Sequence, residues 1–459
     1  MPPEHPITFG GGISETALHP AVLAAMLIAI ALVMMLPRRY VLIPLIFITV
    51  LAPCGQGAVF AGVHLYVTRI ITIFALLRVI QAKFTSRDRV FANGYTSVDS
   101  ACVWCILCQA AAVILLFHDV PSLINQAGIL IDWLALYIIL RFLLRDKQDS
   151  FRALRCFAII TVVLAVCMVV EHVKGVNLFS LIGGMRATPE LREGKIRAQA
   201  SFAHPLLAGA FGATLLPLFI LLWQGGRAKV VAAMGIIGAA AMTITSNSST
   251  PLLACAAGAA GAMLWPIRRK MRSVRWGIVV ALVVLAVVMK APVWFVIAHI
   301  DLTGGSSSYH RAALIDQFIR HFSDWWLLGV KDAGTWGWDM WDAQNQYVSV
   351  GDTGGLVALV LFILLISRSF GRLGDARKAI AGDKKQEAYP WLLGAALFAH
   401  VVGFFGVNYF DQTRVSWLFL IAVISSLAAQ TAPQRGPRDR QPAELSADAA
   451  LSSTAGVFG

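Results

Sequence analysis

The sequence has few charged residues. Asp, Glu, Lys and Arg make up 14% of its 459 residues, hydrophobic residues make up 58%, and the mean hydropathy is +0.71. Soluble globular domains contain about a quarter charged residues, so this composition excludes a soluble domain. It predicts an all-α fold, that of a polytopic helical membrane protein, and a function linked to a membrane.

Acidic residues are also scarce, with 25 Asp and Glu against 38 Lys and Arg, for a net charge of +13. In a membrane protein, basic residues gather in cytoplasmic loops and set the orientation of the chain. Here 27 of the 38 basic residues fall in clusters on one side of the predicted spans. We therefore read the charge as a topology signal and expect no nucleic-acid partner.

Cysteine is sparse. Six of the seven cysteines fall inside long predicted spans and Cys54 falls in the short second one, which argues against a disulfide framework. Cys102, Cys105 and Cys108 recur every three residues on one span, and packing is favoured over metal ligation there. No signal peptide is recognisable, because the first apolar run has no basic segment before it and no small-residue cleavage site. That run is expected to remain a span.

A helical span needs about 20 apolar residues. On this basis the sequence predicts 12 or 13 spans, of which the second is short, over residues 17–36, 41–56, 60–80, 101–117, 123–143, 154–172, 201–223, 228–246, 250–266, 276–297, 346–367, 390–408 and 414–430.

An outer N-terminus places the basic clusters in the cytoplasm. If the second span is re-entrant or joins the third, the N-terminus lies inside and the later assignments stand. Residues 1–430 then form one transmembrane domain with long outer loops over 173–200 and 298–345. Residues 431–459 are expected to be a disordered cytoplasmic tail.

Two ionisable residues lie at matching depths inside predicted spans, Arg69 in the third and Asp132 in the fifth. An unpaired charge at such a depth costs about 2.5–3.5 kcal/mol. The sequence predicts either a buried Arg69–Asp132 pair that locks two helices or a hydrated site where Arg69 binds an anion.

The first outer loop is basic against the usual bias, and its Arg197 stands a few residues before a span that begins near His204-Pro205. A guanidinium at that depth can grip a lipid-linked phosphate through two hydrogen bonds, and ordinary headgroup anchoring is the alternative.

The second outer loop is expected to carry a surface helix from about Tyr309 to Phe322. Its predicted apolar stripe is Ala312, Ile315, Ile319 and Phe322, which leaves His310 and Arg311 on faces available to a site. An amphipathic lid with solvated charges is the alternative. The loop also holds five tryptophans, which suit either an interfacial belt or platforms for sugar rings: Trp325, Trp326, Trp336, Trp338 and Trp341. Their concentration in one loop favours sugar binding.

These residues resemble the O-antigen ligase and polymerase superfamily of bacterial envelope glycosyltransferases. Four features carry the resemblance: a long outer loop before the last three spans, Arg197 ahead of Phe202-Ala203-His204-Pro205, Arg311 opening the loop helix, and Asn345-Gln346-Tyr347 followed by Gly351 and a new span. The match covers about residues 180–370. Two departures are Gln344, where ligases of the family usually have histidine, and Ser246-Asn247-Ser248-Ser249, where many members have Ser-Arg-Gly.

The resemblance implies a cofactor-free, metal-independent transfer of a glycan from undecaprenyl pyrophosphate to a sugar hydroxyl of an acceptor glycan. The active site would face the periplasm of a bacterial inner membrane. Arg197 and Arg311 are the expected pyrophosphate clamps, with Arg69 or Arg186 as a third, because arginine can neutralise the leaving group. His310 or a loop carboxylate such as Asp316, Asp339 or Asp342 is the candidate base. The expected substrate contacts also include His204, Gln344, Asn345, Tyr347, Trp336, Trp338 and Trp341.

Gln344 favours an exopolysaccharide or O-antigen polymerase over a ligase acting on the lipid A core. Proteins of polysaccharide export or chain-length control are candidate partners. The competing class is a small-solute or inorganic-carbon transporter, suggested by the many spans and by Arg69 and Asp132. Against it stand the lack of a clear internal repeat and the long Trp-rich loop.

Overall fold

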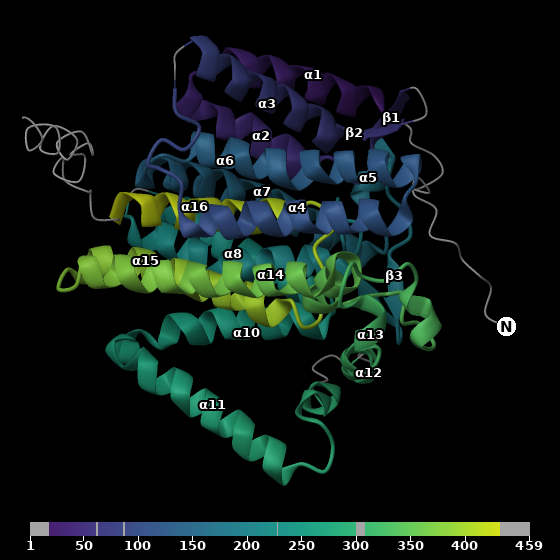
Figure 1. Ribbon diagram of the computed structural model, residues 1–459. Helices are drawn as coiled ribbons and strands as arrows, with labels where there is room; N and C mark the ends of the chain where they lie inside the picture. Colours follow the sequence, from purple (N-terminus) through teal and green to yellow (C-terminus); the bar gives the residue numbers. More distant parts are fainter. Residues whose placement is uncertain (1–17, 61–62, 86–87, 227, 300–307, 432–459) are drawn as a thin grey trace, which may run out of the picture.

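The computed structural model describes residues 18–60, 63–85, 88–226, 228–299 and 308–431, so the predicted tail over 431–459 lies almost wholly outside the described residues. The described chain is mostly helical (Figure 1). Its first ten helices are α1 (Pro20–Met35), α2 (Arg38–Leu51), α3 (Val67–Thr85), α4 (Ser97–Phe117), α5 (Val120–Leu130), α6 (Leu136–Leu143), α7 (Lys147–Lys174), α8 (Pro205–Gln224), α9 (Lys229–Thr245) and α10 (Ser249–Met263). The others are α11 (Met271–Val288), α12 (Ser308–Arg320), α13 (Phe322–Trp325), α14 (Gln346–Ala379), α15 (Lys384–Gly403) and α16 (Thr413–Thr431).

Short elements join these helices. A π-helical turn, η1 (Ile131–Ala135), links α5 to α6. Four 3-10 segments are η2 (Leu178–Ile182), η3 (Trp265–Lys270), η4 (Val293–His299) and η5 (Ala333–Trp336). The strands form two antiparallel hairpins, β1 (Gly57–Phe60) with β2 (Val63–Tyr66), and β3 (Glu190–Arg192) with β4 (Lys195–Arg197).

Seven helical segments within the described residues are long and apolar enough to cross a membrane. They are Ser97–Phe117, Val120–Leu143, Lys147–Lys174, Pro205–Gln224, Trp265–Val288, Gln346–Ala379 and Thr413–Thr431. Three further apolar helices, α1, α9 and α10, are shorter. The predicted spans 41–56, 60–80 and 390–408 overlap α2, α3 and α15, with bounds displaced by several residues. The prediction of a helical bundle with long apolar helices is therefore confirmed.

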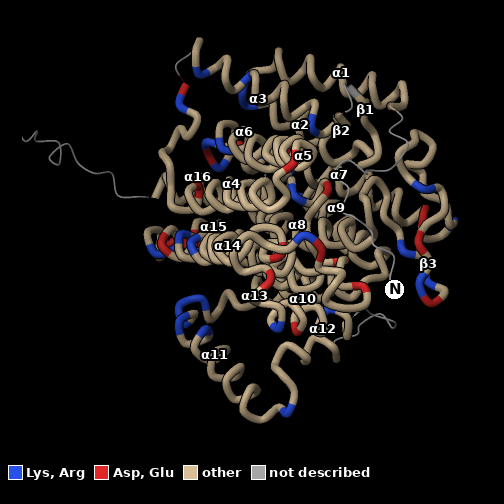
Figure 2. Tube along the Cα trace, turned by 45° about the vertical axis from the view of Figure 1, so that its right-hand side comes forward, with Lys and Arg blue, Asp and Glu red and all other residues tan. Residues whose placement is uncertain are grey.

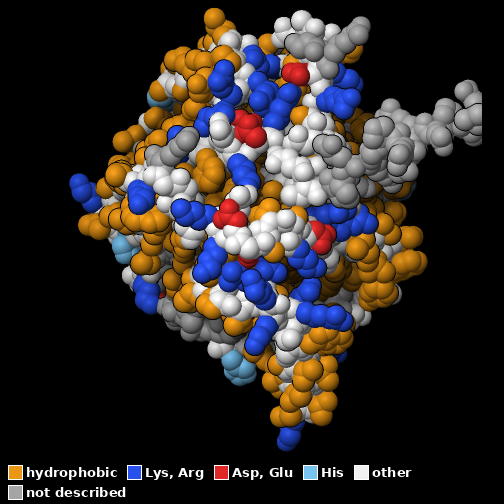
Figure 3. All heavy atoms as spheres, turned by 90° about the vertical axis from the view of Figure 1, so that its left-hand side faces the viewer, with side chains coloured by type: hydrophobic (Ala, Val, Ile, Leu, Met, Phe, Trp, Pro, Cys, Tyr) orange, Lys and Arg blue, Asp and Glu red, His pale blue; other side chains and the backbone are white. Residues whose placement is uncertain are grey.

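The main helices lie side by side with roughly parallel axes and alternate in direction (Figure 1). The two ends of this bundle differ in what they carry. One end carries both β-hairpins and the loop helices α12 and α13, and we call it the hairpin end. The opposite face is rich in Lys and Arg and has few acidic residues (Figure 3), and we call it the basic end. The backbone amide of His19 donates to Gln56 Oε1 at 2.9 Å, so α1 begins at the hairpin end and α2 returns to it.

The two hairpins are the main departure from the all-α prediction. β1–β2 occupies the start of the predicted span 60–80, so α3 begins only at Val67. In β3–β4 the turn residues Glu193 and Gly194 have φ values of 49° and 74°, as two-residue hairpin turns require. That register places Glu190 directly opposite Arg197.

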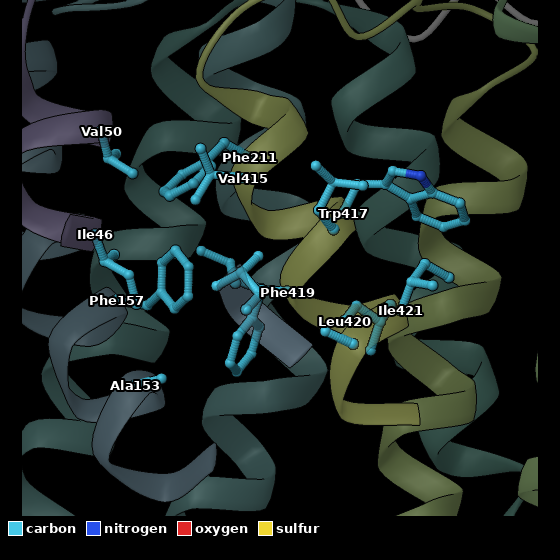
Figure 4. Packing of buried hydrophobic residues seen from close by; sticks show 14 of the residues in the cluster. Ile46, Val50, Ala153, Phe157, Phe211, Val415, Trp417, Phe419, Leu420 and Ile421 are labelled. Carbon is cyan, nitrogen blue, oxygen red and sulfur yellow. The ribbon is translucent and has the colours of Figure 1, made fainter. Parts of the chain in front are cut away.

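The largest core surrounds α16, most of whose side chains are buried. Figure 4 shows Phe419 of α16 facing Phe157 of α7, and their ring centroids are 5.1 Å apart. Phe157 also packs against Phe211 of α8 at 6.1 Å. Between helices in a lipid bilayer, van der Waals packing of this kind drives association, because apolar side chains are not removed from water there. In contrast, α11 has no buried residue and stands away from the bundle in Figure 1.

A buried ion pair joins α4 to α6 near the basic end. Asp99 and Arg141 are 0% and 1% exposed, and Arg141 Nε donates to Asp99 Oδ1 at 2.6 Å. Tyr137 Oη donates to the same oxygen at 2.7 Å. Asp99 also forms the capping box of α4 with Thr96. This carboxylate therefore fixes both the start of α4 and its packing on α6.

Candidate functional site

Among the predicted site residues, Arg197 has the surroundings best suited to anion binding. Its side chain is 5% exposed and pairs with Glu190 across the β3–β4 hairpin. Burial lowers the pKa of the guanidinium, and the Glu190 carboxylate acts in the opposite direction. Arg197 Nε has no hydrogen-bond partner among the described residues. A buried charged group with an unused donor is suited to bind an anion.

The hairpin brings Arg197 to the first turn of α10. Arg197 Nη2 donates to Ser248 Oγ at 2.6 Å, and the amide of Ala198 donates to the carbonyl of Thr245 at 3.1 Å. Asn247 Nδ2 donates to the carbonyl of Ile196 at 2.7 Å. β4 is thus held against the turn between α9 and α10, whose helix start favours negative charge.

His204 completes this side of the site. It caps α8, since its Nδ1 accepts from the amide of Leu206 at 3.1 Å. A ring nitrogen that accepts carries no proton, so the hydrogen bonds assign the proton to Nε2. His204 Nε2 lies 3.3 Å from Glu190 Oε2. Glu190 therefore lies between Arg197, with which it pairs, and the Nε2 of a neutral His204.

A buried polar network fixes the segment between Arg197 and His204. Glu171 accepts from the amides of Gln199 and Ala200 at 3.1 and 2.8 Å. Asp411 accepts from the amide of Ala203 at 3.1 Å, and Gln412 Nε2 donates to the carbonyl of Ser201 at 2.8 Å. Because these bonds come from α7 and from the turn before α16, the position of Arg197 depends on distant parts of the chain.

Arg311 approaches the same turn of α10 from the other long loop. It is 7% exposed on α12. A Cβ atom added at Gly406 would lie 3.2 Å from Arg311 Nε and 2.3 Å from Thr250 Oγ1, so both side chains converge on this glycine. We call Glu190, Arg197, His204, Ser248, Thr250 and Arg311 the α10 cluster. The two arginines named as clamps from the sequence thus flank one helix start, although they are more than 100 residues apart.

The predicted helix over Tyr309–Phe322 is confirmed as Ser308–Arg320. The predicted apolar stripe is right for Ala312, which is buried, and for Ile315, which packs within the loop, but wrong for Ile319 and Phe322. The helix buries Arg311, Ala312, Leu314 and Phe318, while Ile319 and Phe322 are 46% and 45% exposed. Arg311 therefore lies on the buried face and not on an outer face. The helix turns this face towards the bundle because Leu314 and Phe318 pack into a core within the loop.

Two of the tryptophans belong to that loop core. Trp325 stacks on Phe318 with centroids 3.9 Å apart, and Trp336 is buried and stacks on His321 at 5.3 Å. Trp338 and Trp341 are 87% and 72% exposed. Within the loop, Trp336 thus serves packing, and Trp338 and Trp341 are more open to a ligand than Trp326, which is 46% exposed.

The large loop is attached to a break in α14. Gly355 has φ 70° and ψ −174°, which interrupts the helix. The amide of Leu356 donates to the carbonyl of Trp326 at 2.8 Å. The amide of Val330 donates to the carbonyl of Asp352 at 2.7 Å. Residues 326–330 therefore supply hydrogen-bond partners for the carbonyl of Asp352 and the amide of Leu356, which would bond to each other in a continuous helix. Figure 2 shows charged residues around this loop and at β3–β4.

The loop exit is used for positioning. Asn345 is 1% exposed and caps α14, and its Nδ2 donates to the carbonyl of Phe405 at 3.3 Å. Tyr347 Oη donates to the carbonyl of Val401 at 3.0 Å. Gln344 donates to Asp342, which acts electrostatically on His204. Asn345 thus holds the turn that carries Gly406, and Tyr347 holds the end of α15. Asp342 is close enough to His204 to act on its charge.

The remaining candidates lie elsewhere. The predicted Arg69–Asp132 pair is confirmed, with Arg69 Nη2 at 2.8 Å from Asp132 Oδ2, but its contacts are not with the α10 cluster. Arg186 is exposed and forms no ion pair within the described part of the chain. His310 is partly buried, and its Nε2 has no hydrogen-bond partner among the described residues.

Three residues were missed as functional candidates. Glu190 and Ser248 pair with Arg197, and only the hairpin register and the fold bring them there. Arg414 reaches Asp132 with Nη2 and Oδ1 3.6 Å apart. A basic residue at the outer start of a predicted span was the available signal for Arg414.

No group of three or more His, Cys, Asp or Glu residues in the described ranges is arranged to hold a metal ion. Cys102 and Cys105 are buried in the main core, as packing residues would be. Comparison of the sequence with protein-family models and with curated proteins gives no significant match.

Proposed function

We propose that the protein is a multi-pass membrane glycosyltransferase that uses a polyprenyl-pyrophosphate-linked oligosaccharide, with its active site at the α10 cluster. The transfer extends a growing glycan, as in an exopolysaccharide or O-antigen polymerase. The observation that carries the proposal is the convergence of buried Arg197 and Arg311 on the first turn of α10. The basic end, which lies opposite, fits a cytoplasmic face and so supports an outward-facing cluster (Figure 3).

In this reaction a hydroxyl oxygen of the acceptor attacks the anomeric carbon of the donor sugar. The bond from that carbon to the pyrophosphate oxygen breaks, and the hydroxyl proton passes to a base. Negative charge grows on the departing pyrophosphate, so donors fixed before the reaction lower the barrier. Arg197, Arg311 and the start of α10 would supply those donors.

In the absence of substrate, the Glu190 carboxylate occupies the position next to Arg197 that the substrate would take. This carboxylate pairs with Arg197 and lies 3.3 Å from His204 Nε2, in the place that a pyrophosphate oxygen would take. When pyrophosphate displaces it from Arg197, Glu190 is released next to the reacting groups and can accept the acceptor proton. It thereby joins His310 and Asp342 as a candidate base.

The test is complementation of a deletion strain. Arg197→Ala and Arg311→Ala should each reduce polymer by about 10²–10³-fold, the usual effect of losing one transition-state donor. Membrane levels of the protein should stay normal. Lys174→Ala and Arg320→Ala, exposed basic residues of the same two loops, are the matched controls and should keep wild-type polymer.

Analysis of lipid-linked glycans in the deletion strain separates the candidate functions. Accumulated single repeat units support a polymerase, and accumulated long lipid-linked chains support a ligase. Unchanged glycans, or wild-type polymer from both arginine variants, would reject glycosyl transfer at this site. Transport is then the function to test.

A further inference from the structure

A second cationic group lies at the hairpin end, apart from the α10 cluster. Asp132 stands between two arginines, with Arg69 Nη2 at 2.8 Å from Oδ2 and Arg414 Nη2 at 3.6 Å from Oδ1. The side chains of Arg69 and Arg414 are 14% and 12% exposed. Among the described residues, Asp132 is the carboxylate that forms an ion pair with each guanidinium, while Asp411, three residues before Arg414, acts on Arg414 electrostatically without pairing with it. The group of Arg69, Asp132 and Arg414 itself carries one more positive than negative charge in a largely enclosed place, where an unbalanced charge is costly.

The local backbone is shaped around this group. Asp132 lies in the π-helical turn η1, a form that is rare and frequent at functional sites. Gly128, one turn earlier, faces Arg69, and a Cβ atom there would lie 2.6 Å from Arg69 Cζ. Arg414 Nε has no hydrogen-bond partner among the described residues. A pair that only locked two helices would need neither a second, partly unsatisfied arginine nor the excess charge of the group.

An apolar cavity of about 160 Å³ lies beside the group. Ile129 and Trp133 line it from α5 and η1, and Trp417 and Leu418 line it one turn beyond Arg414 on α16. The same two helices therefore contribute both the charged group and the cavity wall. Gln109, Gln346 and Ser349 also line the cavity and are only partly buried, so it is not sealed.

We infer that Arg69, Asp132, Arg414 and this cavity form a binding site for a phosphate-headed lipid. The two guanidiniums take the phosphate, with Asp132 holding both in place. The cavity takes the first apolar units of the chain, since a cavity of about 150 Å³ accommodates a group the size of benzene. The remainder of the chain leaves through the partly open side. The site does not depend on glycosyl transfer at the α10 cluster.

Two sources share this chemistry, a phospholipid and a polyprenyl phosphate, and native mass spectrometry of the full-length protein in detergent can distinguish them. The probes are dioleoylphosphatidylglycerol and farnesyl monophosphate, with farnesol as the probe that lacks a phosphate. We expect one retained copy of at least one phosphate probe and none of farnesol. Retention of only one phosphate probe identifies the source.

Variants of each half of the site complete the test. Arg414→Gln removes the second guanidinium, and Ser349→Phe fills the cavity; each should lower the retained fraction about tenfold or more, as loss of a charged hydrogen bond does. Arg414→Lys, which keeps charge without the planar fork, is a second variant should Arg414→Gln fold poorly. Arg320→Gln, exposed on α12, is the control. Retention of neither phosphate probe, equal retention of farnesol, or retention unchanged by the variants would overturn the inference.

Discussion

Glu190 and Arg197 are cross-strand partners in the β3–β4 hairpin, and the same Arg197 donates to Ser248 at the start of α10 at 2.6 Å. The hairpin therefore links a carboxylate, a guanidinium and a helix start that are separated in sequence. Since each element constrains the next, the geometry of the α10 cluster can be tested one bond at a time.

Ser248 should act by orienting Arg197. Ser248→Ala removes one charged hydrogen bond, worth about 1.5–3 kcal/mol, and is expected to lower polymer formation by about tenfold or more. Ser248→Thr keeps the hydroxyl and should retain most activity. The readout is polymer yield at matched protein level, with thermal unfolding as the check on folding. Equal activity of the alanine and threonine variants would show that this bond does not matter.

Glu190→Gln separates proton acceptance from packing, because the amide keeps the size of the side chain and loses the negative charge. If Glu190 is the base, the variant should still bind a lipid pyrophosphate, and more tightly, since the competing carboxylate charge is gone. Its transfer rate should fall by about 10²–10⁴-fold, the range of general base catalysis. Comparison of donor binding with single-turnover transfer measures both. A normal transfer rate would assign the base elsewhere, to His310 or Asp342.

Gly355 should be required for docking of the large loop. It has φ 70°, and a Cβ atom there would lie 2.5 Å from the carbonyl oxygen of Leu327. Gly355→Ala is expected to detach residues 326–330 from α14 and to make the loop more susceptible to limited proteolysis. Gly371→Ala, on the same helix with open space around it, is the matched control. Unchanged cleavage of the Gly355 variant would mean that the break in α14 tolerates a side chain.

The sequence predicts the helical bundle well because apolar runs of span length have few alternatives. It also predicts the Arg69–Asp132 pair, since two opposite charges at equal depth need each other. The buried face of α12 was missed because apolar spacing alone selected Ile319 and Phe322, whereas the loop core selects Leu314 and Phe318.

The α10 cluster is only partly readable from sequence. Arg197 and Arg311 stand out as basic residues in the predicted outer loops, but the approach of each to the start of α10 depends on tertiary structure. Glu190 enters through hairpin register, which follows from the turn at Glu193-Gly194. No local pattern indicates that Gly406, in the turn after α15, lies between Thr250 and Arg311.

The Asp99–Arg141 pair should dominate the stability of the basic end. Asp99→Asn leaves Arg141, 1% exposed, without its counter-charge, and breaking a buried pair in this way costs about 3–5 kcal/mol. Replacing both residues by leucine should cost less than the single change. Asp383→Asn, at the exposed cap of α15, is the control and should have a much smaller effect on unfolding in detergent. A small effect of Asp99→Asn would show that water or neighbouring groups compensate.

The orientation of the bundle can be tested with single cysteines at its two ends. Leu191, 67% exposed in β3, and Ala381, exposed in the turn before α15, are suitable positions. The background replaces the partly buried native cysteines by serine: Cys54, Cys108, Cys167 and Cys255. Because basic residues are retained on the cytoplasmic side, a membrane-impermeant maleimide applied to intact spheroplasts should label Leu191→Cys and not Ala381→Cys. Ala381→Cys should react only after the membrane is permeabilised, which also shows that it is folded and accessible. The reverse pattern would place Arg197 and Arg311 on the cytoplasmic side, out of reach of a glycan donor on the outer face, and would reject the proposed function whatever the effect of the arginine variants.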